Sequence, residues 1–394
     1  MNATIADDKL IIALDGRIDT NNAAQVEKEI LDILAQNPGK VPAFDAAALE
    51  YISSAGLRVL MKVRKQVKKS VTVENVSRDV YEIFETTGFT EILDVRKALR
   101  QLSVEGCEEI GKGANGVVYR LSPDTMVKVY QHGADLDVVN QERETSKKAF
   151  LMGVPCAIAF DTVRCGESYG AVYELLNGAT VTERIRENPE KLDEYARRMG
   201  ELAKTMHQVE ISEGTLPRAS KMLYKSIDRI ASYFTEEEVE QMKEVYRAIP
   251  EQNFFVHNDY HTKNVMESGG ELVLIDMGDV GAGNPLIDLI HTLMVNLLIG
   301  GNTGNHPDDE MAFNGLTYGE MKRFWAVFSE TYFGSEEKAR EATETMMPYA
   351  RFMYLTSSMG HPILPDSMRP AMAEGIRKDI LPHVAEMKRP LVLF

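Results

Sequence analysis

The stretch "EEIGKGANGVVYR", residues 108–120, contains Gly111, Gly113 and Gly116 in the spacing G-x-G-x-x-G. Small residues at this spacing let a loop approach phosphate oxygens closely, but more than one nucleotide-binding fold uses the pattern. The flanking residues distinguish between those folds. After the third glycine, "GVVYRL" continues as a β-branched and aromatic strand, and the turn "SPDT" and the strand "MVKVY" follow. The sequence therefore predicts a hairpin with a glycine-rich tip, and the three glycines are candidate contacts for nucleotide phosphates.

Lys128 lies within the otherwise apolar strand "MVKVY". An unpaired ammonium group in such a strand would be costly to bury, so the lysine needs an anion. The following helix, "DVVNQERETSKKAFLMG", offers Glu142 as a partner that would hold Lys128 against the α- and β-phosphates, with Glu144 as the alternative. A lysine on an edge strand, with its charged end in water, is the purely structural explanation. The glycine loop before it favours the nucleotide-binding one.

The stretch "HNDYHTKN", residues 257–264, lies between two apolar segments, and "ELVLIDMGD" then brings Asp276 to the end of a predicted strand. Phosphoryl transfer from a nucleotide gives these polar groups distinct tasks. Asp259 would accept or orient the proton of an attacking hydroxyl, whereas Asn264 and Asp276 would bind Mg²⁺ that bridges the phosphates. We expect His257 to support the loop through packing and hydrogen bonds. ATP and Mg²⁺ are the predicted cofactors, although the sequence leaves GTP open as the donor.

Three segments resemble the aminoglycoside phosphotransferase and choline kinase group of the protein kinase-like fold: "ERETSKKAFLMGVPCA", "HNDYHTKN" and "IDMGDVGAGNPLIDL". The likeness extends from about residue 103 to the C-terminus. It implies that Asp288 supports the catalytic loop and that backbone groups around Glu174 and Leu176, in "VYELLNG", hold the nucleotide base. A protein kinase would have a long activation segment after Asp276, whereas a helix is predicted here almost at once. Small-molecule kinases are therefore favoured over ordinary protein kinases.

The first 98 residues show alternating strand and helix patterns. "KLIIALDGRID" predicts a strand that stops at Asp15-Gly16, and further strands and amphipathic helices follow in turn, which indicates an α/β layer domain. "LDGRID", "DAAALEYISSAGLRVL" and "VSRDVYEIFETTGFTEIL" resemble the STAS family of the anti-sigma factor antagonist type. That resemblance implies a protein partner and a phosphorylated serine at the start of the second helix, here Ser54.

Ser54 would meet unpaired backbone N–H groups and the positive end of the helix dipole, so this position tolerates a phosphate. Arg58, Lys62 and Lys65 follow on the same helix. The alternative is that Ser53 or Ser54 only caps the helix. The sequence departs from the family pattern on both sides, because Ser53 replaces the usual Asp and Ala55 replaces a hydroxyl residue.

Helical patterns dominate residues 180–250 and 286–394, where related enzymes build the acceptor pocket. An acidic segment and an aromatic group are candidate contacts for a cationic acceptor. The alternative is a solvated acidic loop and an ordinary aromatic core. The residues concerned are Asp308, Asp309 and Glu310, and Trp325 with Phe324 or Phe328.

Composition limits the classes of function. The formal net charge is −16, of which residues 1–98 contribute −2, and this charge argues against nucleic acid or an anionic membrane as the main partner. The longest apolar stretch is interrupted by polar residues and is too short to span a bilayer. The three cysteines contain no CxxC pair, so neither a disulfide framework nor a zinc site is indicated and a cytoplasmic location is expected.

These patterns predict an α/β STAS domain (1–98) followed by a two-lobed α+β kinase-like fold. Its N-lobe would span 99–179, and its largely helical C-terminal lobe, with the acceptor-binding helices, would span 180–394. The leading hypothesis is a phosphotransferase that uses ATP and Mg²⁺ to phosphorylate a hydroxyl of a small molecule, with the STAS domain as a regulatory or docking module. One alternative is a serine kinase that phosphorylates Ser54 of its own or a partner STAS domain. Another is a nucleotide-binding scaffold without catalysis.

Overall fold

The chain divides into two units, Met1–Leu102 and Ser103–Phe394, a few residues after the boundary that we placed at 98/99. The structure is a computed structural model that describes residues 1–6, 9–68, 71–113, 116–299, 308, 310–312, 315–361 and 364–387. Each unit has its own hydrophobic core and is described by itself.

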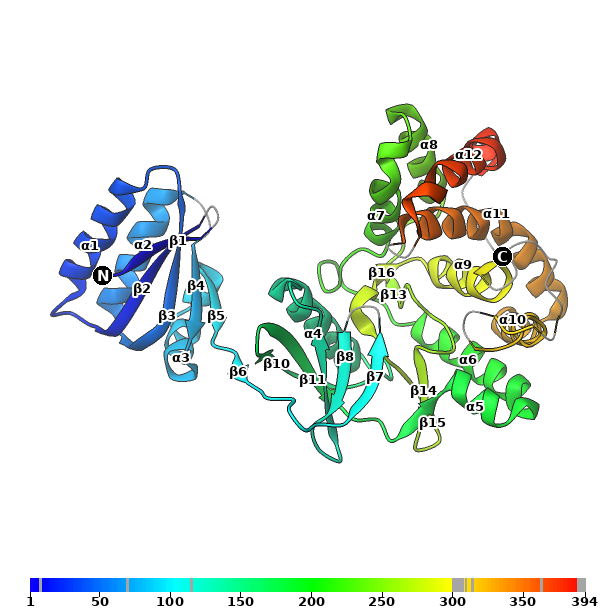
Figure 1. The fold of residues 1–394 in the computed structure, drawn as a ribbon, viewed down its shortest axis with the longest axis horizontal. Helices are drawn as coiled ribbons and strands as arrows, with labels where there is room; N and C mark the ends of the chain where they lie inside the picture. Colours follow the sequence, from blue (N-terminus) through cyan, green and yellow to red (C-terminus); the bar gives the residue numbers. More distant parts are fainter. Residues whose placement is uncertain are drawn as a thin grey trace. The chain divides into compact units, whose positions relative to one another are not determined.

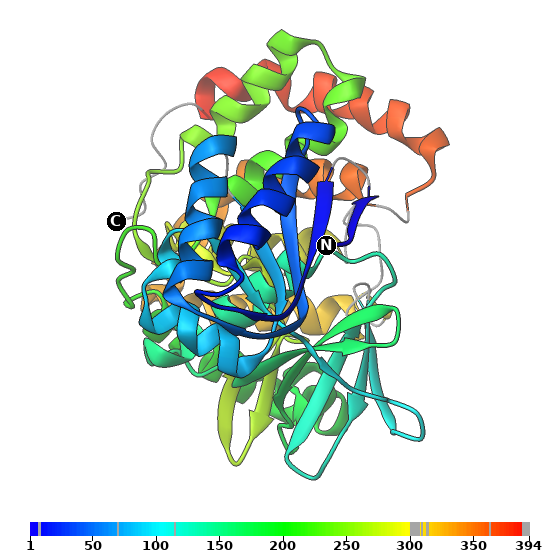
Figure 2. The ribbon, with the colours of Figure 1, turned by 90° about the vertical axis from the view of Figure 1, so that its left-hand side faces the viewer.

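Unit 1 is a sheet with the strand order β1-β2-β3-β4-β5. The strand β1 is antiparallel to β2, and the other neighbours are parallel. Helices α1 and α2 lie side by side against this sheet (Figures 1 and 2). The elements are β1 (Ala3–Ala6), β2 (Lys9–Ile18), α1 (Ala23–Gln36), β3 (Val41–Ile52), α2 (Ser54–Val67), β4 (Thr72–Val76), α3 (Arg78–Thr86), η1 (Phe89–Glu91), β5 (Asp94–Lys97) and β6 (Arg100–Gln101).

The first predicted strand is longer than the sequence pattern suggested. It does not stop at Asp15-Gly16 but continues to Ile18. The pairing with β3 shifts register twice around this point, and Gly16 has a φ of 61°. The dipeptide Asp15-Gly16, which we expected to form a turn, therefore forms part of a bulge within the strand.

The start of α2 is fixed by a cap and by a close approach to the sheet. The Ser53 side chain accepts hydrogen bonds from the backbone N–H groups of Ala55 and Gly56, at 3.2 and 3.4 Å. A Cβ on Gly56 would lie 2.7 Å from side-chain atoms of Ile18 and Ile52, so glycine lets the first turn pack onto the strands.

Unit 2 has two lobes. The N-terminal lobe is a sheet in the order β10-β11-β9-β8-β7 with α4 packed beside it, and the C-terminal lobe is mostly helical with the small sheets β12-β14-β15 and β13-β16 (Figure 1). The N-terminal lobe contains β7 (Glu109–Gly113), β8 (Gly116–Arg120), β9 (Thr125–Tyr130), α4 (Leu136–Leu151), β10 (Ala159–Cys165) and β11 (Ser168–Glu174). The C-terminal lobe contains β12 (Gly178–Thr180), α5 (Val181–Glu187), η2 (Pro189–Lys191), α6 (Leu192–Met206), α7 (Ser220–Ile230), η3 (Ala231–Tyr233), α8 (Glu236–Arg247), β13 (Phe254–Val256), β14 (Val265–Ser268), β15 (Glu271–Leu274), η4 (Met277–Asp279), β16 (Gly281–Gly283), α9 (Leu286–Met294), the π-helix η5 (Val295–Ile299), α10 (Tyr318–Phe333), α11 (Glu336–Gly360), η6 (Asp366–Met368), α12 (Arg369–Asp379), η7 (Leu381–His383) and α13 (Val384–Met387).

Capping boxes explain where several helices of the C-terminal lobe begin. Thr180, Thr235 and Thr317 each accept from the backbone three residues later, where a Glu side chain reaches back to the threonine N–H. These reciprocal bonds satisfy donors that a helix start leaves free. The predicted amphipathic helices in this lobe are present as α6, α8 and α10.

Candidate active site

The strand β9 and the helix α4 bring a lysine and a glutamate together. Nζ of Lys128 donates to Oε1 of Glu142 at 2.8 Å and to Oδ1 of Asp276 at 3.0 Å. Burial alone would lower the pKa of Lys128, but the charges of Glu142 and Asp276 outweigh it, and the pKa lies above its ordinary value. The lysine is therefore cationic at neutral pH. The alternative partner, Glu144, contacts Arg143 instead.

Tyr173, at the end of β11, also contacts this ion pair, and the sequence analysis missed it. Its hydroxyl donates to Oε1 of Glu142 at 3.4 Å, and its side chain is buried. The glutamate is itself only 9% exposed, so these partners take the place of water around its carboxylate. Three elements of the lobe thus fix the carboxylate that holds Lys128.

The three glycines of the loop differ in how much space a side chain would have at each position. A Cβ on Gly116 would lie 2.2 Å from the backbone oxygen of Val129, so packing alone requires glycine there. A Cβ on Gly113 would meet nothing within 4 Å, and one on Gly111 would make only ordinary contact with Val118. The open space beside Gly111 and Gly113 fits a loop that leaves room for a ligand. Residues 114 and 115, at the tip, lie outside the described residues.

Glu174 and Leu176 lie where the two lobes join. The backbone N–H of Glu174 donates to Ile158 O at 2.9 Å, and its side chain accepts from Ile158 N at 2.8 Å. The carbonyl of Leu176 accepts from Gly178 N at 3.1 Å. That backbone groups of this segment hold the nucleotide base stays a prediction.

The carboxylate of Asp259 is 36% exposed and has three side-chain neighbours. Asn264 donates through Nδ2 to Oδ2 at 2.8 Å, while Nε2 of His261 and Nε2 of His291 lie 3.3 and 3.4 Å from Oδ1. Desolvation would raise the pKa of Asp259, but the neighbouring histidines, His261 foremost, lower it well below the ordinary range. Asp259 is therefore ionised at neutral pH, as a proton acceptor must be.

His257 connects this loop to the strand that precedes Asp276. Its Nδ1 accepts from the backbone N–H of Asp259 at 3.3 Å, so Nε2 carries the proton and donates to Ile275 O at 3.1 Å. The side chain is fully buried. This placement fits the supporting role that we expected for His257, because one imidazole contacts the backbone of both Asp259 and the residue before Asp276.

Asp288, on α9, accepts from the backbone of the loop. Its Oδ2 accepts from His257 N at 2.8 Å, and its Oδ1 accepts from Asn258 N at 2.6 Å. His207 on α6 contributes Nε2 at 3.1 Å from Oδ2, a contact that the sequence analysis missed. The carboxylate is buried, and these donors satisfy its oxygens.

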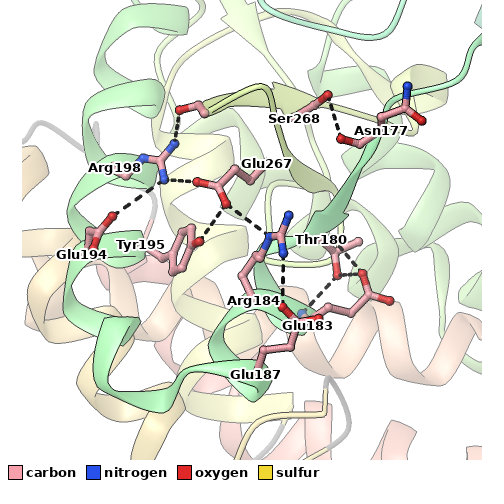
Figure 3. Close-up of polar contacts among 11 residues, drawn as sticks. Asn177, Thr180, Glu183, Arg184, Glu187, Glu194, Tyr195, Arg198, Glu267 and Ser268 are labelled. Carbon is pink, nitrogen blue, oxygen red and sulfur yellow. Dashed lines mark hydrogen bonds and ion pairs between the residues drawn. The ribbon is translucent and has the colours of Figure 1, made fainter. Parts of the chain in front are cut away.

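The hairpin β14–β15 connects Asn264 to Asp276, and a polar cluster anchors it (Figure 3). Glu267 on β14 contacts Arg198 and accepts from the Tyr195 hydroxyl at 2.9 Å, both on α6. Arg184 on α5 lies 3.2 Å from the same carboxylate. The hydrogen bond from Arg198 and its companions lower the pKa of Glu267. The two predicted metal ligands are therefore carried at the ends of a braced hairpin.

Asn258 and Asp276 have backbone φ angles of 65° and 57°, in the left-handed region. Residues other than glycine rarely adopt this backbone conformation, and such strain is concentrated at functional sites. Asn258 donates through Nδ2 to Asp279 O at 2.6 Å, which joins the loop to η4. One strained residue thus directly precedes Asp259, and the other is Asp276 itself.

Of the two explanations for the aromatic group, the structure supports the ordinary core, because Phe324, Trp325 and Phe328 belong to the hydrophobic core. All three are buried, and Trp325 donates through Nε1 to Thr343 Oγ1 at 3.0 Å. Of the acidic segment, Asp308 pairs with Lys322 at 2.6 Å, and Asp309 lies outside the described residues. The helical repeat of α10 places its aromatic stripe on the inner face.

Ser54 is the first residue of α2, and its side chain is exposed. Ser53 performs the capping, which leaves the hydroxyl of Ser54 outside the cap. Arg58 and Lys65 on the same helix are exposed as well, and Lys62 pairs with Glu27 at 2.7 Å.

Residues 106–323 match the phosphotransferase enzyme family, known as APH. The chain belongs to this phosphotransferase family. Residues 1–102 match the STAS domain, so the phosphotransferase also carries an N-terminal STAS domain. The predicted fold class is thereby confirmed: an α/β STAS domain precedes a kinase-like phosphotransferase fold with a helical C-terminal region.

Individual relatives match one domain or the other. BtrV of Bordetella bronchiseptica, named as a candidate anti-sigma factor antagonist, is 36% identical over 92 residues, which are 23% of this chain and 78% of BtrV. An ADP-bound structure of aminoglycoside phosphotransferase APH(2'')-Ib is 16% identical, covers 78% of this chain and 99% of its own, and has a TM-score of 0.47. A choline/ethanolamine kinase family protein from Mesorhizobium loti is 14% identical, covers 72% and 92%, and has a TM-score of 0.43.

The phosphotransferase site can be tested for its fit to Mg²⁺. Among the described residues, no group of three or more His, Cys, Asp or Glu side chains is arranged to hold a metal ion. Mg²⁺ is often bound through one or two protein ligands, with phosphate oxygens and water completing the shell. Both side-chain hydrogen bonds of Asn264 use Nδ2, which leaves Oδ1 for such a role, and Asp276 is 44% exposed. These oxygen ligands fit a Mg²⁺ ion that binds together with a nucleotide.

The same region carries an excess of negative charge. Desolvation and the charges of Asp259 and Asp276 raise the pKa of Asp279. A divalent cation would relieve this repulsion.

In the part of the chain that the structure describes, no helix combines the length and apolar character that crossing a membrane requires.

Proposed function

We propose that the protein transfers the γ-phosphoryl group of ATP, with Mg²⁺, to a hydroxyl of a small molecule, and that its STAS domain regulates this reaction or docks a protein partner. The observation that carries the proposal is the series of contacts that joins Lys128 to Asp276 on one side and Asn264 to Asp259 on the other. The family match supports the reaction class.

In the proposed reaction, the acceptor oxygen forms a bond to the γ-phosphorus while the bond from that phosphorus to the leaving oxygen of ADP breaks. Asp259 orients the hydroxyl and takes its proton. Lys128, held by Glu142, places the α- and β-phosphates, and Gly111 and Gly113 leave space for their approach. Mg²⁺ at Asn264 and Asp276 would neutralise the phosphate charge.

The test is turnover of a broad panel of hydroxyl metabolites by the full chain with Mg²⁺-ATP, compared with Asp259→Ala. We expect the variant to lose at least about 10³-fold in kcat while still binding nucleotide, because the lost interaction belongs to the transition state. Unchanged kcat in the variant would contradict the role of Asp259. Absence of turnover by the wild type with every compound would argue against a small-molecule acceptor.

A second candidate function, phosphorylation of Ser54, is favoured by the exposure of that hydroxyl beside a helix start that Ser53 already caps. Intact-mass measurement after incubation with Mg²⁺-ATP distinguishes it from the first. A gain of one phosphate that is lost in both Ser54→Ala and Asp259→Ala would indicate self-phosphorylation of the STAS domain. No gain, with nucleotide bound, would direct the search to small molecules.

A further inference from the structure

A network of hydrogen bonds connects α10 to the loop 257–264 through α6 and α9. The hydroxyl of Tyr332, on α10, lies 2.9 Å from Nδ1 of His207, which directly follows the last residue of α6. Nε2 of His207 lies 3.1 Å from Oδ2 of Asp288 on α9. Asp288 accepts in turn from the backbone N–H groups of His257 and Asn258. The network thus ends at the two residues that precede the proposed base.

Each link of this network joins a donor to an acceptor. Both oxygens of Asp288 already accept from the backbone, so Nε2 of His207 is a third donor to the carboxylate, and Nδ1 accepts from the hydroxyl of Tyr332. Burial raises the pKa of Tyr332, and the charge of Asp288 acts in the same direction, so the hydroxyl keeps its proton at neutral pH. Asp288 and His207 are themselves buried. The imidazole is therefore held at both nitrogens, and turning it would leave buried groups unpaired.

The packing of α6 against α10 fixes the distance between the histidine and the tyrosine. A Cβ on Gly200 of α6 would lie 3.0 Å from the Cβ of Thr331 and 3.1 Å from Phe328 O, so glycine lets the two helices approach closely. The ring of Tyr332 meets the imidazole of His207 edge to face, with 5.6 Å between the centroids. The hydroxyl is therefore presented to Nδ1 by a helix whose position is set by close packing.

The other end of the network supports a strained backbone. Asn258 has a φ of 65°, and its N–H donates to Oδ1 of Asp288 at 2.6 Å. A left-handed backbone at a residue other than glycine persists only when its surroundings hold it. Rotation of the Asp288 carboxylate would weaken this bond and the bond from His257 N together. The orientation of one buried carboxylate thus sets the backbone from which the side chain of Asp259 projects.

We propose that Tyr332 and His207 are positioning residues for the phosphotransferase, because they hold the carboxylate of Asp288 in the orientation that fixes the backbone next to Asp259. This inference rests on the proposed function and adds two residues to it. Both act through Asp288 and touch no reacting atom. Loosening the network would leave the binding of Mg²⁺-ATP intact, since Lys128 is held by other elements, but it would let the base leave the productive geometry.

The kinetic test uses Tyr332→Phe in the full chain, which removes one hydroxyl and keeps the ring. We expect kcat to fall by roughly 3–10-fold, with KM for Mg²⁺-ATP within about twofold, because the buried Nδ1 of His207 loses its donor. Tyr246→Phe is the matched control, because Tyr246 is also buried and its hydroxyl bonds to Thr356 instead. Wild-type kcat in Tyr332→Phe, or an equal loss in Tyr246→Phe, would overturn the proposal and leave the phosphotransferase function standing.

A double-mutant cycle distinguishes one connected network from two independent structural contacts. His207→Leu removes the middle of the network, and we expect it to lower kcat by roughly 10–10²-fold. Adding Tyr332→Phe to this variant should change kcat by less than about twofold, because the tyrosine no longer has a path to Asp288. A double variant whose loss equals the product of the two single losses would overturn the proposal.

Hydrogen exchange tests the inference without an acceptor. The backbone N–H groups of His257 and Asn258 are the donors at the end of the network, and we expect them to exchange about 3–10-fold faster in Tyr332→Phe than in the wild type or in Tyr246→Phe. Exchange of α4, in the other lobe, reports any global loss of stability. Unchanged exchange at the two N–H groups, or an equal increase in α4, would overturn the inference. If the wild type phosphorylates no acceptor, the proposed function fails, and the exchange rates still decide whether the network holds the loop.

Discussion

The loop 257–264 and the start of α2 are both candidate sites for handling a phosphoryl group, and they are built in opposite ways. In the loop, buried groups fix the backbone at His257 and Asn258 and the side chain of Asp259. At Ser54, one neighbouring serine caps the helix and the hydroxyl itself is exposed. A group that performs chemistry must be held in place, whereas a group that is modified must be reachable.

After Asp259→Ala in the loop itself, the largest expected effect comes from Lys128→Met, which lies opposite the loop across Asp276. The substitution removes the cation between Glu142 and Asp276, and we expect kcat/KM for ATP to fall on the order of 10²-fold. Steady-state kinetics measures it, with Lys147→Met on the exposed face of α4 as the control. Equal activity of the two variants would show that the lysine is only structural.

A smaller effect is expected from Asp288→Asn. An amide cannot accept from both backbone N–H groups and from His207 as the carboxylate does, so a buried donor loses its partner. We expect a loss of about 2–4 kcal/mol in the free energy of unfolding. Chemical denaturation measures this loss. Asp366→Asn, whose side chain is 92% exposed, should change it by less than about 0.5 kcal/mol.

The smallest effects are expected at the start of α2. Ser53→Ala removes the cap and should cost about 1 kcal/mol of stability, whereas Ser54→Ala should change stability by only a few tenths of a kcal/mol. Thermal or chemical unfolding of the two variants provides the comparison. A larger loss for Ser54→Ala would mean that Ser54, not Ser53, stabilises the helix.

Much of the fold and part of the site were predictable because they depend on local patterns. The glycine hairpin, the partner of Lys128 and the position of Asp276 after a strand follow from spacing within short segments. The contacts of His207 and His291 were not predictable, because a histidine within or at the end of a helix has no sequence signal that identifies its distant partner. The one available hint for His291 was its position three residues after Asp288, on a similar face of the helix.

The sequence left two explanations for the aromatic group open for a physical reason. Phe324, Trp325 and Phe328 recur at helical spacing, and that period indicates a packed face without saying whether a ligand or the core fills it. All three side chains are buried, so they pack in the core. The strand that passed through Asp15-Gly16 shows the same limit, because a turn dipeptide can equally form a bulge when neighbouring strands continue to pair.

The left-handed backbones at Asn258 and Asp276 have a consequence for how this sequence can change. Glycine would adopt either conformation with less strain, by on the order of 1 kcal/mol. Glycine would also remove an amide that ties the loop to η4 and a carboxylate that pairs with Lys128. At both positions the strained backbone is therefore coupled to a side-chain contact between segments that are distant in the sequence, so relief of the strain and loss of the contact would come together.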